Sequence, residues 1–122
     1  MNIRRINHVQ LAMPAGEEDA ARAFYSGILG IPEKAKPAHV AARGGAWFEA
    51  GELKVHLGVD ADFRPAQKAH PAFEVDDLAT LSEACTASGY RVISDQPLKG
   101  YTRVYVYDPF GNRIKLMERL GK

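Results

Sequence analysis

Four side chains stand at matching places in the two halves of this chain, and their types suit a metal ion or a small ligand. His8 lies near the start of NHVQLAMP, and His70 near the start of the similar segment AHPAFEVD. His56 in KVHLGV and Lys115 in RIKLME match each other in a later segment of each half. When the halves are aligned by their apolar positions, His8 corresponds to His70 and His56 to Lys115. We therefore predict that four strands bring these side chains together about one pseudo-twofold axis.

The three imidazoles of this set predict a metal site. Neutral histidine is a good ligand for divalent transition metals, and three histidines are enough for a catalytic zinc with an open fourth position. Zinc, nickel, iron or manganese are the candidate ions for His8, His56 and His70. Lys115 opposes this interpretation, because an ammonium repels a cation. A single histidine on a half-buried strand is also more often a hydrogen-bonded wall residue than a ligand.

Other side chains with the same strand parity are predicted to line the cavity. Trp47 and Tyr105 would form aromatic walls, while Arg103 and Lys115 favour an anionic ligand, so these four are candidate substrate-binding residues. Cys85 lies on the apolar stripe of a predicted helix, which indicates a packing residue rather than a nucleophile.

The cavity depends on elements that occur twice along the chain. In the first half, alternation predicts a strand over 6–13, a helix over 17–29 ending at Gly30, and short strands from 33 to 59. In the second half, a strand begins near residue 70, and a helix follows with Asp76 as its N-cap. Strands near 90–94, 102–107 and 113–118 complete the order, with DPFGN as the last turn. Each half therefore reads βαβββ.

The predicted fold class is α+β. Two pseudo-symmetric βαβββ modules, at about 1–59 and 69–118, are joined by a linker at about 60–68 and together form one domain of 1–122. A module this short leaves one sheet face open. Pairing the modules is predicted to give a curved mixed sheet around a central trough, with the helices outside.

Composition narrows the function classes. The 122 residues are 46% hydrophobic and 25% charged, with a net charge of +1, which is ordinary for a globular protein. Scattered basic residues give no reason to expect nucleic acid, and no apolar stretch is long enough for a membrane helix. The amino terminus has no signal-peptide pattern, and one cysteine makes no internal disulfide, so we expect a cytoplasmic protein.

With His8, His70 and the segments FYSGILGIPE, AFEVDDL and YDPFGNRIKLME in view, the chain resembles the vicinal oxygen chelate superfamily over nearly its full length. This group includes glyoxalases, bleomycin-resistance proteins, fosfomycin-resistance enzymes and extradiol dioxygenases. The resemblance implies paired modules around a divalent metal, with His8, His56 and His70 at ligand positions. Lys115 falls where such proteins usually have glutamate. Glu118 is predicted to face the other side of the strand, which leaves it unable to replace that ligand. Glu49 and Glu74 are weaker candidates for the carboxylate that moves a proton in glyoxalase-type isomerisation.

Two functions follow from this resemblance. One is a metal-dependent enzyme related to glyoxalase-like lyases, epimerases or dioxygenases, in which the metal acts as a Lewis acid on an oxygen-rich small molecule. The other is a metal-free binding protein similar to those that sequester bleomycin-like drugs. A degenerate homologue without present chemistry is a third interpretation. The resemblance also implies a homodimer, with the site either inside one chain or shared between two.

Overall fold

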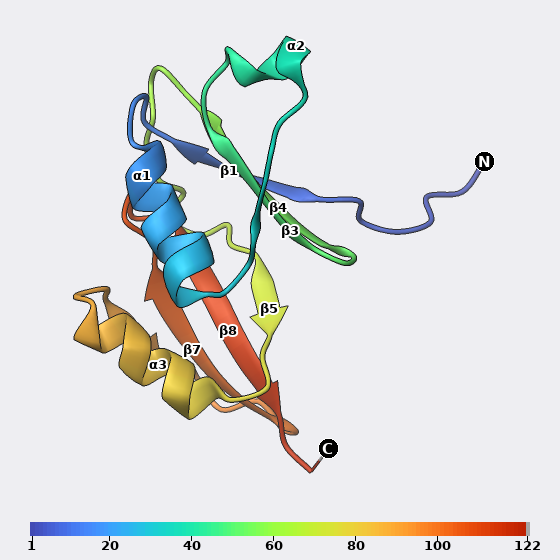
Figure 1. Cartoon of the computed structure of the whole chain (residues 1–122). Helices are drawn as coiled ribbons and strands as arrows, with labels where there is room; N and C mark the ends of the chain where they lie inside the picture. The colour runs from blue at the N-terminus through green and yellow to red at the C-terminus, as the bar shows by residue number, and fades with distance from the viewer. Residues whose placement is uncertain (122) are drawn as a thin grey trace. The chain divides into compact units, whose positions relative to one another are not determined.

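The computed structural model describes residues 1–121 and divides the chain into two compact units. Unit 1 is Met1–Arg64 and unit 2 is Pro65–Lys122. The boundary falls inside the segment 60–68 that was predicted as a linker. Each unit carries one four-stranded mixed sheet with a helix of its own (Figure 1).

In unit 1 the strand order is β1-β4-β3-β2. The strand β1 is parallel to β4, and the other two pairs are antiparallel. Parallel pairing of the first and last strands needs a crossover, which the helix and the two intervening strands supply. The strands are β1 (Val9–Met13), β2 (Glu33–Lys34), β3 (Ala46–Ala50) and β4 (Leu53–Val59).

The helical segment of unit 1 changes its winding along its length. It begins as the α-helix α1 (Glu18–Ala21) and continues as the π-helix η1 (Arg22–Ile28), within the range predicted for one helix. Gly30 ends it with φ +75, as the sequence predicted. The wider π turn places Phe24 and Tyr25 together in the core, where the Tyr25 ring stacks on Phe48 of β3 at 5.5 Å between centroids. A second short helix, α2 (Ala38–Ala41), precedes β3.

Unit 2 repeats the same plan with the strand order β5-β8-β7-β6. Again the first strand is parallel to the last, and the other pairs are antiparallel. The helix packs against β6, β7 and β8. The elements are β5 (Ala72–Glu74), α3 (Leu78–Ala87), β6 (Val92–Ser94), β7 (Tyr101–Tyr107) and β8 (Arg113–Arg119).

The register of the two sheets confirms the predicted repeat. Gln10 lies opposite His56 in the β1–β4 pair, and Ala72 lies opposite Lys115 in the β5–β8 pair. His56 and Lys115 are therefore equivalent, and His8 and His70 each lie two residues before the matching partner positions. The fold is α+β and consists of two βαβββ modules, as predicted. Its strands form two separate four-stranded sheets.

Strand parity separates the two faces of each sheet. On β8, Ile114 and Leu116 are buried, with Lys115 between them on the opposite face. On β4, Val55 and Leu57 are buried on the helix side, and His56 points the other way. The predicted site residues therefore share the face of each sheet that is opposite its helix.

The start of α3 corrects one prediction. Its N-cap is Asp77, not Asp76: the Asp77 carboxylate accepts hydrogen bonds from Thr80 N at 3.1 Å and Thr80 Oγ1 at 2.8 Å. Glu118 also accepts a hydrogen bond from Leu78 N at 2.8 Å. Glu118 thus lies on the helix side of β8, which confirms that it faces away from Lys115. Its role is to hold the first turn of α3.

The DPFGN turn sets the register that positions Lys115. Asp108 Oδ1 accepts from the backbone nitrogens of Phe110 and Asn112 at 2.9 and 2.8 Å. Asp108 Oδ2 accepts from Asn112 Nδ2 at 2.9 Å, and Gly111 takes φ +91. This closed turn joins β7 to β8 and places Tyr105 opposite Lys115.

The first strand is shorter than predicted. It begins at Val9 rather than Ile6. Its partner β4 begins at Leu53, which the register places opposite residue 7, so Ile6 lies beyond the end of β4. The preceding residues extend away from the sheet of unit 1 (Figure 1), and Ile3 and Ile6 are 100% and 83% exposed. His8 consequently lies just ahead of β1 and is exposed.

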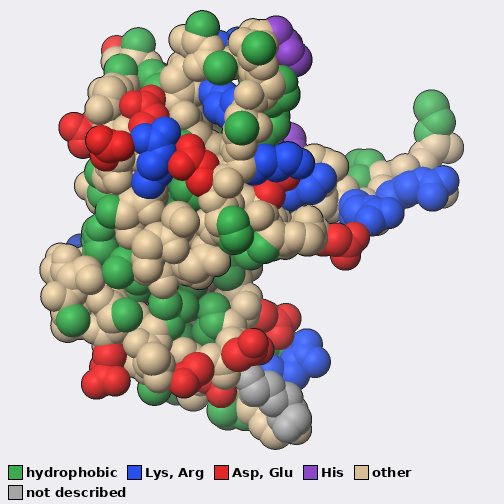
Figure 2. Space-filling view, in the orientation of Figure 1, with side chains coloured by type: hydrophobic (Ala, Val, Ile, Leu, Met, Phe, Trp, Pro, Cys, Tyr) green, Lys and Arg blue, Asp and Glu red, His purple; other side chains and the backbone are tan. Residues whose placement is uncertain are grey.

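Charged side chains are mixed over the visible surface of unit 1. Figure 2 shows acidic and basic side chains interspersed over the α1 region, without one continuous basic patch on that face. Within residues 1–121, none of the helices has the length and apolar character that crossing a membrane requires.

Candidate functional site

The open face of unit 1 carries a stack of three rings. The His56 ring lies between Trp47, at 4.2 Å between centroids and 6° between planes, and His8, at 4.5 Å and 21°. Trp47 comes from β3, His56 from β4, and His8 from the residue before β1. Three of the predicted site residues are therefore in contact. The stack fixes the plane of the His56 imidazole.

A carboxylate fixes the edge of the same imidazole. His56 Nε2 lies 2.7 Å from Glu49 Oε2, and both side chains are nearly covered. The hydrogen bond with His56 holds the pKa of Glu49 below its usual value, and Lys34 Nζ, 3.5 Å from the other oxygen, acts in the same direction. Because an ionised carboxylate only accepts, His56 Nε2 is the donor, and in the neutral ring Nδ1 carries the lone pair.

The open face of unit 2 is arranged around Tyr105 of β7. The guanidinium carbon of Arg113 lies 4.3 Å from the ring centroid, and the ammonium of Lys115 lies 4.9 Å from it. The ring of His70 meets Tyr105 edge-on at 5.2 Å. Both cations are within the distance at which the negative face of an aromatic ring attracts a positive charge. Tyr105 is thus a platform for two cationic groups.

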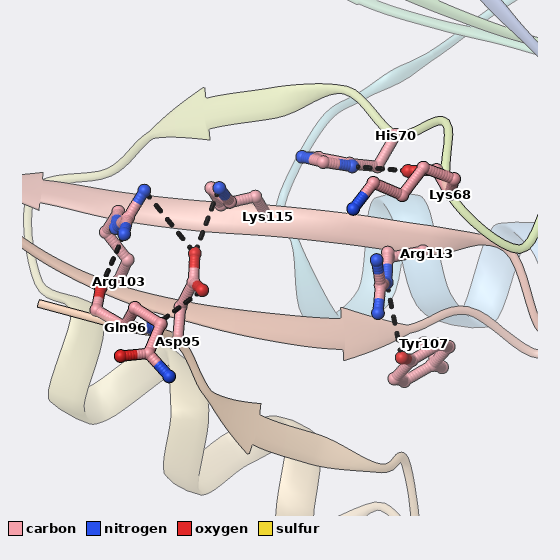
Figure 3. A network of polar contacts seen from close by, with 8 residues as sticks. All are labelled: Lys68, His70, Asp95, Gln96, Arg103, Tyr107, Arg113 and Lys115. Atoms are coloured by element: carbon pink, nitrogen blue, oxygen red, sulfur yellow. Dashed lines mark hydrogen bonds and ion pairs between the residues drawn. The ribbon is translucent and has the colours of Figure 1, made fainter. Parts of the chain in front are cut away.

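One acidic side chain joins this cationic group. Asp95 Oδ2 lies 2.9 Å from Lys115 Nζ and 3.4 Å from Arg103 Nη1. The exposed fractions of the three side chains are only 12% for Asp95, 12% for Lys115 and 14% for Arg103. Lys115 lowers the pKa of Asp95, so the carboxylate is ionised. Figure 3 shows Lys115 of β8 and Arg103 of β7 converging on this residue, which follows β6.

Backbone and hydroxyl groups orient two more donors on this face. His70 Nδ1 lies 2.9 Å from the carbonyl oxygen of Lys68, and a carbonyl only accepts, so Nδ1 carries the proton. In the neutral ring, Nε2 then carries the lone pair. Arg113 Nε donates to Tyr107 Oη at 3.3 Å, which raises the pKa of the arginine (Figure 3). His70 itself lies in the segment ahead of β5.

The predicted site residues therefore fall into two groups. Unit 1 brings together His8, His56 and Trp47, and unit 2 brings together His70, Arg103, Tyr105 and Lys115. Within either unit, the described residues contain no cluster of three or more histidine, cysteine, aspartate or glutamate side chains suited to a metal ion. The three-histidine ligand set draws on both units and stays a prediction.

Sequence reasoning underrated two acidic residues at these faces. Glu49 was a weak candidate only, although its position two residues after Trp47 places it on the same strand face as Trp47. Asp95 was missed. The signal for it was the hairpin between the strands near 90–94 and 102–107, which pairs Asp95 N with Arg103 O at 3.3 Å. The other weak candidate, Glu74, forms an exposed ion pair with Arg119 at 3.5 Å.

A hollow of about 420 Å³ lies beside the ends of β1 and β4 in unit 1. Gln10 reaches across β4 there. A Cβ on Gly58 would lie 2.5 Å from Gln10 Nε2, so glycine makes room for this side chain. The hollow carries no cationic side chain. Its lining residues are Gln10, Leu11, Ala12, Gly58, Val59, Asp60 and Ala61.

Comparison with known proteins supports the resemblance. Residues 5–116 match the family model of the Glyoxalase/Bleomycin resistance protein/Dioxygenase superfamily. Among curated protein sequences, none matches the chain.

Solved structures with the same fold include one close relative. A glyoxalase family protein from Bacillus anthracis is 44% identical over 98% of both chains, with a TM-score of 0.91. A glyoxalase/dioxygenase from Nostoc punctiforme is 23% identical, covering 97% of this chain and 92% of its own, with a TM-score of 0.79. The fosfomycin resistance protein FosX from Listeria monocytogenes is 16% identical, covering 96% and 94%, with a TM-score of 0.76. The last two similarities concern the fold alone.

Proposed function

Because the chain belongs to the Glyoxalase/Bleomycin resistance protein/Dioxygenase superfamily, we propose that it binds a small, oxygen-rich anionic molecule on the polar face of unit 2. One observation carries this proposal. Arg113 and Lys115 flank the Tyr105 ring, and Arg103 adds a third cation beside Lys115 through their common partner Asp95. Three cations around one acid leave a positive field, which favours an anion.

The surroundings of these cations strengthen their effect. Arg103 and Lys115 are largely covered, and charges removed from water interact more strongly than charges in solvent. The neighbouring rings of Tyr105 and Tyr107 supply an apolar wall with hydroxyl donors. An apolar wall with a few fixed polar groups is the usual construction of a small-molecule site.

We also propose a divalent metal, with His8, His56 and His70 as its ligands. The nitrogen donors are of the type that binds such an ion, and His8 would turn out of its stack on His56 to share it, because the lone pairs of stacked rings lie in separate planes. His70 Nδ1 and His56 Nε2 each donate to an oxygen, an arrangement that typically orients a metal-binding histidine and leaves its other nitrogen as the ligand. The ion pair with Asp95 also offsets the repulsion that a lone Lys115 ammonium would exert on a cation.

In this proposal the metal supplies Lewis-acid polarisation of a ligand oxygen. The protein's own residues do the rest. Lys115 and Arg103 hold negative charge on the ligand, Tyr105 and Trp47 form walls, and Glu49 keeps the His56 ring in one tautomer. This division of roles suits a glyoxalase-like lyase or isomerase, in which negative charge develops on a ligand oxygen. The two units would act together as one glyoxalase-like domain.

Calorimetric titration tests the anion proposal. The probe is oxalate, a small dianion with vicinal oxygens, titrated into protein freed of metal with a chelator. We expect binding that is lost in Arg113→Gln with Lys115→Met and retained in the matched control Lys54→Met with Lys99→Met. Unchanged oxalate affinity in the first double variant would show that this face does not bind anions.

Metal analysis tests the second part. Protein prepared without an affinity tag is reconstituted with zinc, nickel, iron or manganese and then dialysed. We expect about one equivalent of metal, lost in His70→Ala and held more tightly in Lys115→Glu, since a carboxylate replaces an ammonium. Less than about a tenth of an equivalent in every case would contradict the metal proposal.

A metal-free binding protein is the second candidate function. The observation that favours it is Lys115, a cation at the position where the resemblance implies a carboxylate ligand. Oxalate affinity that is the same before and after metal reconstitution supports this candidate. An oxalate affinity that rises when metal is bound supports the metal-dependent function.

A homodimer is part of the proposal as well. The exposed Ile3 and Ile6 precede β1, which is an edge strand of its sheet. Light scattering at micromolar concentration tests this assembly, and a monomeric mass would contradict it. Ile3→Asp with Ile6→Asp is the variant expected to weaken the dimer.

A further inference from the structure

Asp95 occupies the side of Lys115 and Arg103 at which an anion would bind. We propose that its carboxylate is a built-in substitute for a carboxylate of the ligand, which must displace it, and that the site therefore selects carboxylates. This inference rests on the proposed anion-binding function and specifies the chemical class of the ligand. It also makes Asp95 the residue that sets how tightly the ligand binds.

Asp95 Oδ2 contacts Lys115 and Arg103 as ion pairs rather than through well-aligned hydrogen bonds. Oδ2 is buried and lies 2.9 Å from Lys115 Nζ, yet among the described residues it has no hydrogen bond of good geometry. Arg103 Nε is also buried, and it too has no hydrogen-bond partner among the described residues. Arg103 and Lys115 thus retain donor capacity that Asp95 does not use. A buried carboxylate oxygen without a hydrogen bond carries a free-energy cost, which Asp95 would lose by turning outward into solvent.

A carboxylate of the ligand can make the bonds that Asp95 does not. The two Nη groups of arginine form a planar fork that matches two carboxylate oxygens, and lysine can bind the same group as a point charge. Arg103 offers Nη1, which lies 3.4 Å from Asp95 Oδ2, and a second N–H of Nη2, because Nη2 uses only one N–H for the carbonyl oxygen of Gln96. A free carboxylate has the freedom to align with this fork, whereas Asp95 is limited by its backbone.

The backbone at Asp95 permits its displacement. Asp95 follows Ser94, the last residue of β6, and β6 is an edge strand of its sheet. Its amide bond to Arg103 O is long, at 3.3 Å. Its Oδ1 accepts from Gln96 N at 2.7 Å, a local bond that can follow the side chain as it rotates outward. Residues 95–97 contain no strand, and rotating the Asp95 side chain leaves the backbone bond to Arg103 in place.

Charge balance predicts the consequence of removing Asp95. With Asp95 present, an incoming anion must separate an existing ion pair before it meets Lys115. In Asp95→Asn, the shape and the acceptor for Gln96 N remain, but the competing charge is gone. Lys115 and Arg103 are then free to bind the ligand, and the binding free energy no longer includes the cost of separating Asp95 from Lys115.

The test compares oxalate binding by wild type and Asp95→Asn in calorimetry, with inorganic phosphate as a second probe. We expect Asp95→Asn to bind oxalate about tenfold more tightly or better, because the competing charge is removed. Phosphate affinity should rise less, since phosphate is bulkier than the carboxylate that it would replace between the largely covered Lys115 and Arg103. Asp60→Asn is the matched control: Asp60 Oδ1 also accepts a nearby backbone amide, from Asp62 N at 3.0 Å, and the charge change is the same. The control is expected to bind oxalate as wild type does.

Each outcome decides one question. Equal or weaker oxalate binding by Asp95→Asn, with wild type binding oxalate, overturns the displacement model and leaves anion binding standing. Failure of every variant to bind either probe overturns the proposed function itself. An equal gain for phosphate and oxalate shows that the site responds to charge alone and overturns the carboxylate class. Asp95→Ser, checked by thermal unfolding, serves as the second variant if Asp95→Asn does not fold.

Discussion

The ammonium of Lys115 and the carboxylate of Asp95 lie 2.9 Å apart on the open face of unit 2. The charges at this position are reversed relative to the pattern that the family resemblance implies, in which the strand residue is a carboxylate. Here the strand residue is a lysine on β8, and the carboxylate beside it comes from Asp95 at the end of β6. This pairing places an acid between two cations, and it would reduce the repulsion between Lys115 and the metal that we propose.

The first prediction concerns the pKa of Asp95, which Lys115 lowers below its ordinary value. A lowered carboxyl pKa stabilises the fold above the ordinary value of about 3.9, and this contribution is lost as pH falls through the folded-state pKa. In Lys115→Met, we expect the Asp95 midpoint in an NMR titration to rise. Lys99→Met, which changes a lysine in the exposed segment 96–100, is the control. An Asp95 midpoint that does not move in Lys115→Met would contradict the pairing.

A second pH effect is expected in unit 1. Gly45 N donates to Glu18 Oε2 at 2.8 Å, and this bond lowers the pKa of Glu18. Its stabilisation is present above the ordinary glutamate pKa, about 4.3, and is lost on acidification. Glu18→Gln should therefore be less stable than wild type at pH 7, with the difference shrinking below pH ~4. Urea unfolding at several pH values measures this. The neighbouring exposed Glu17→Gln should show a smaller pH-dependent difference.

Gly45 is expected to tolerate no side chain. It has φ +84, and an added Cβ would lie 2.1 Å from the backbone oxygen of Leu57. Gly51 also has positive φ, at +59, but an added Cβ there meets nothing within 4 Å. Gly51→Ala should cost only the left-handed backbone penalty, roughly 1–2 kcal/mol. Gly45→Ala should cost clearly more, as measured by denaturant unfolding. Equal losses would show that the approach of β3 to β4 is looser than described.

The N-cap of α3 gives a direct contrast between adjacent residues. Asp77→Ala removes the acceptor for Thr80 N and should destabilise the protein by about 1 kcal/mol. Asp76→Ala, at the position that the sequence favoured, should cost less. Denaturant midpoints of the two variants measure the difference. A larger loss in Asp76→Ala would restore the original prediction.

Cys85 is expected to react slowly with thiol reagents in the folded protein. Its side chain is fully buried, and burial raises the pKa of the thiol, so little nucleophilic thiolate forms. Labelling with an aromatic disulfide at pH 8 should be slow in buffer and fast in denaturant. Fast labelling in buffer would contradict the burial of Cys85. The result also tests the prediction, made from the apolar stripe of α3, that Cys85 is a packing residue.

Most of the fold could be read from local patterns. Three predictions that depend only on neighbouring residues are confirmed by the structure. They are the alternation over β7 and β8, the DPFGN turn, and Gly30 at the end of the first helix. The start of β1 could not be predicted in this way, because the extent of its partner β4 limits it and alternation does not report that extent. The π-helical turn at Phe24 and Tyr25 was missed for a similar reason: packing against β3 determines it, and helical periodicity does not distinguish it.

The candidate site shows the same division. Strand parity identified Trp47, His56, Tyr105 and Lys115 as residues of the open faces, and the pseudo-symmetric match of His56 with Lys115 agrees with the sheet register. Parity specifies which face a side chain points to, but it says nothing about which acid will reach it. Asp95 comes from the end of an edge strand, and only the β6–β7 pairing brings it to Lys115.

The sequence by itself determined the two βαβββ modules, the apolar and polar faces of their strands, and the cation at position 115. Each of these depends on residue type and short-range periodicity. Tertiary structure alone decided how the charges are compensated. Glu49 meets His56, Asp95 meets Lys115, and Glu118 turns away to hold α3. Such partnerships join segments that are distant in sequence, so the pairing of strands, rather than any local pattern, selects them.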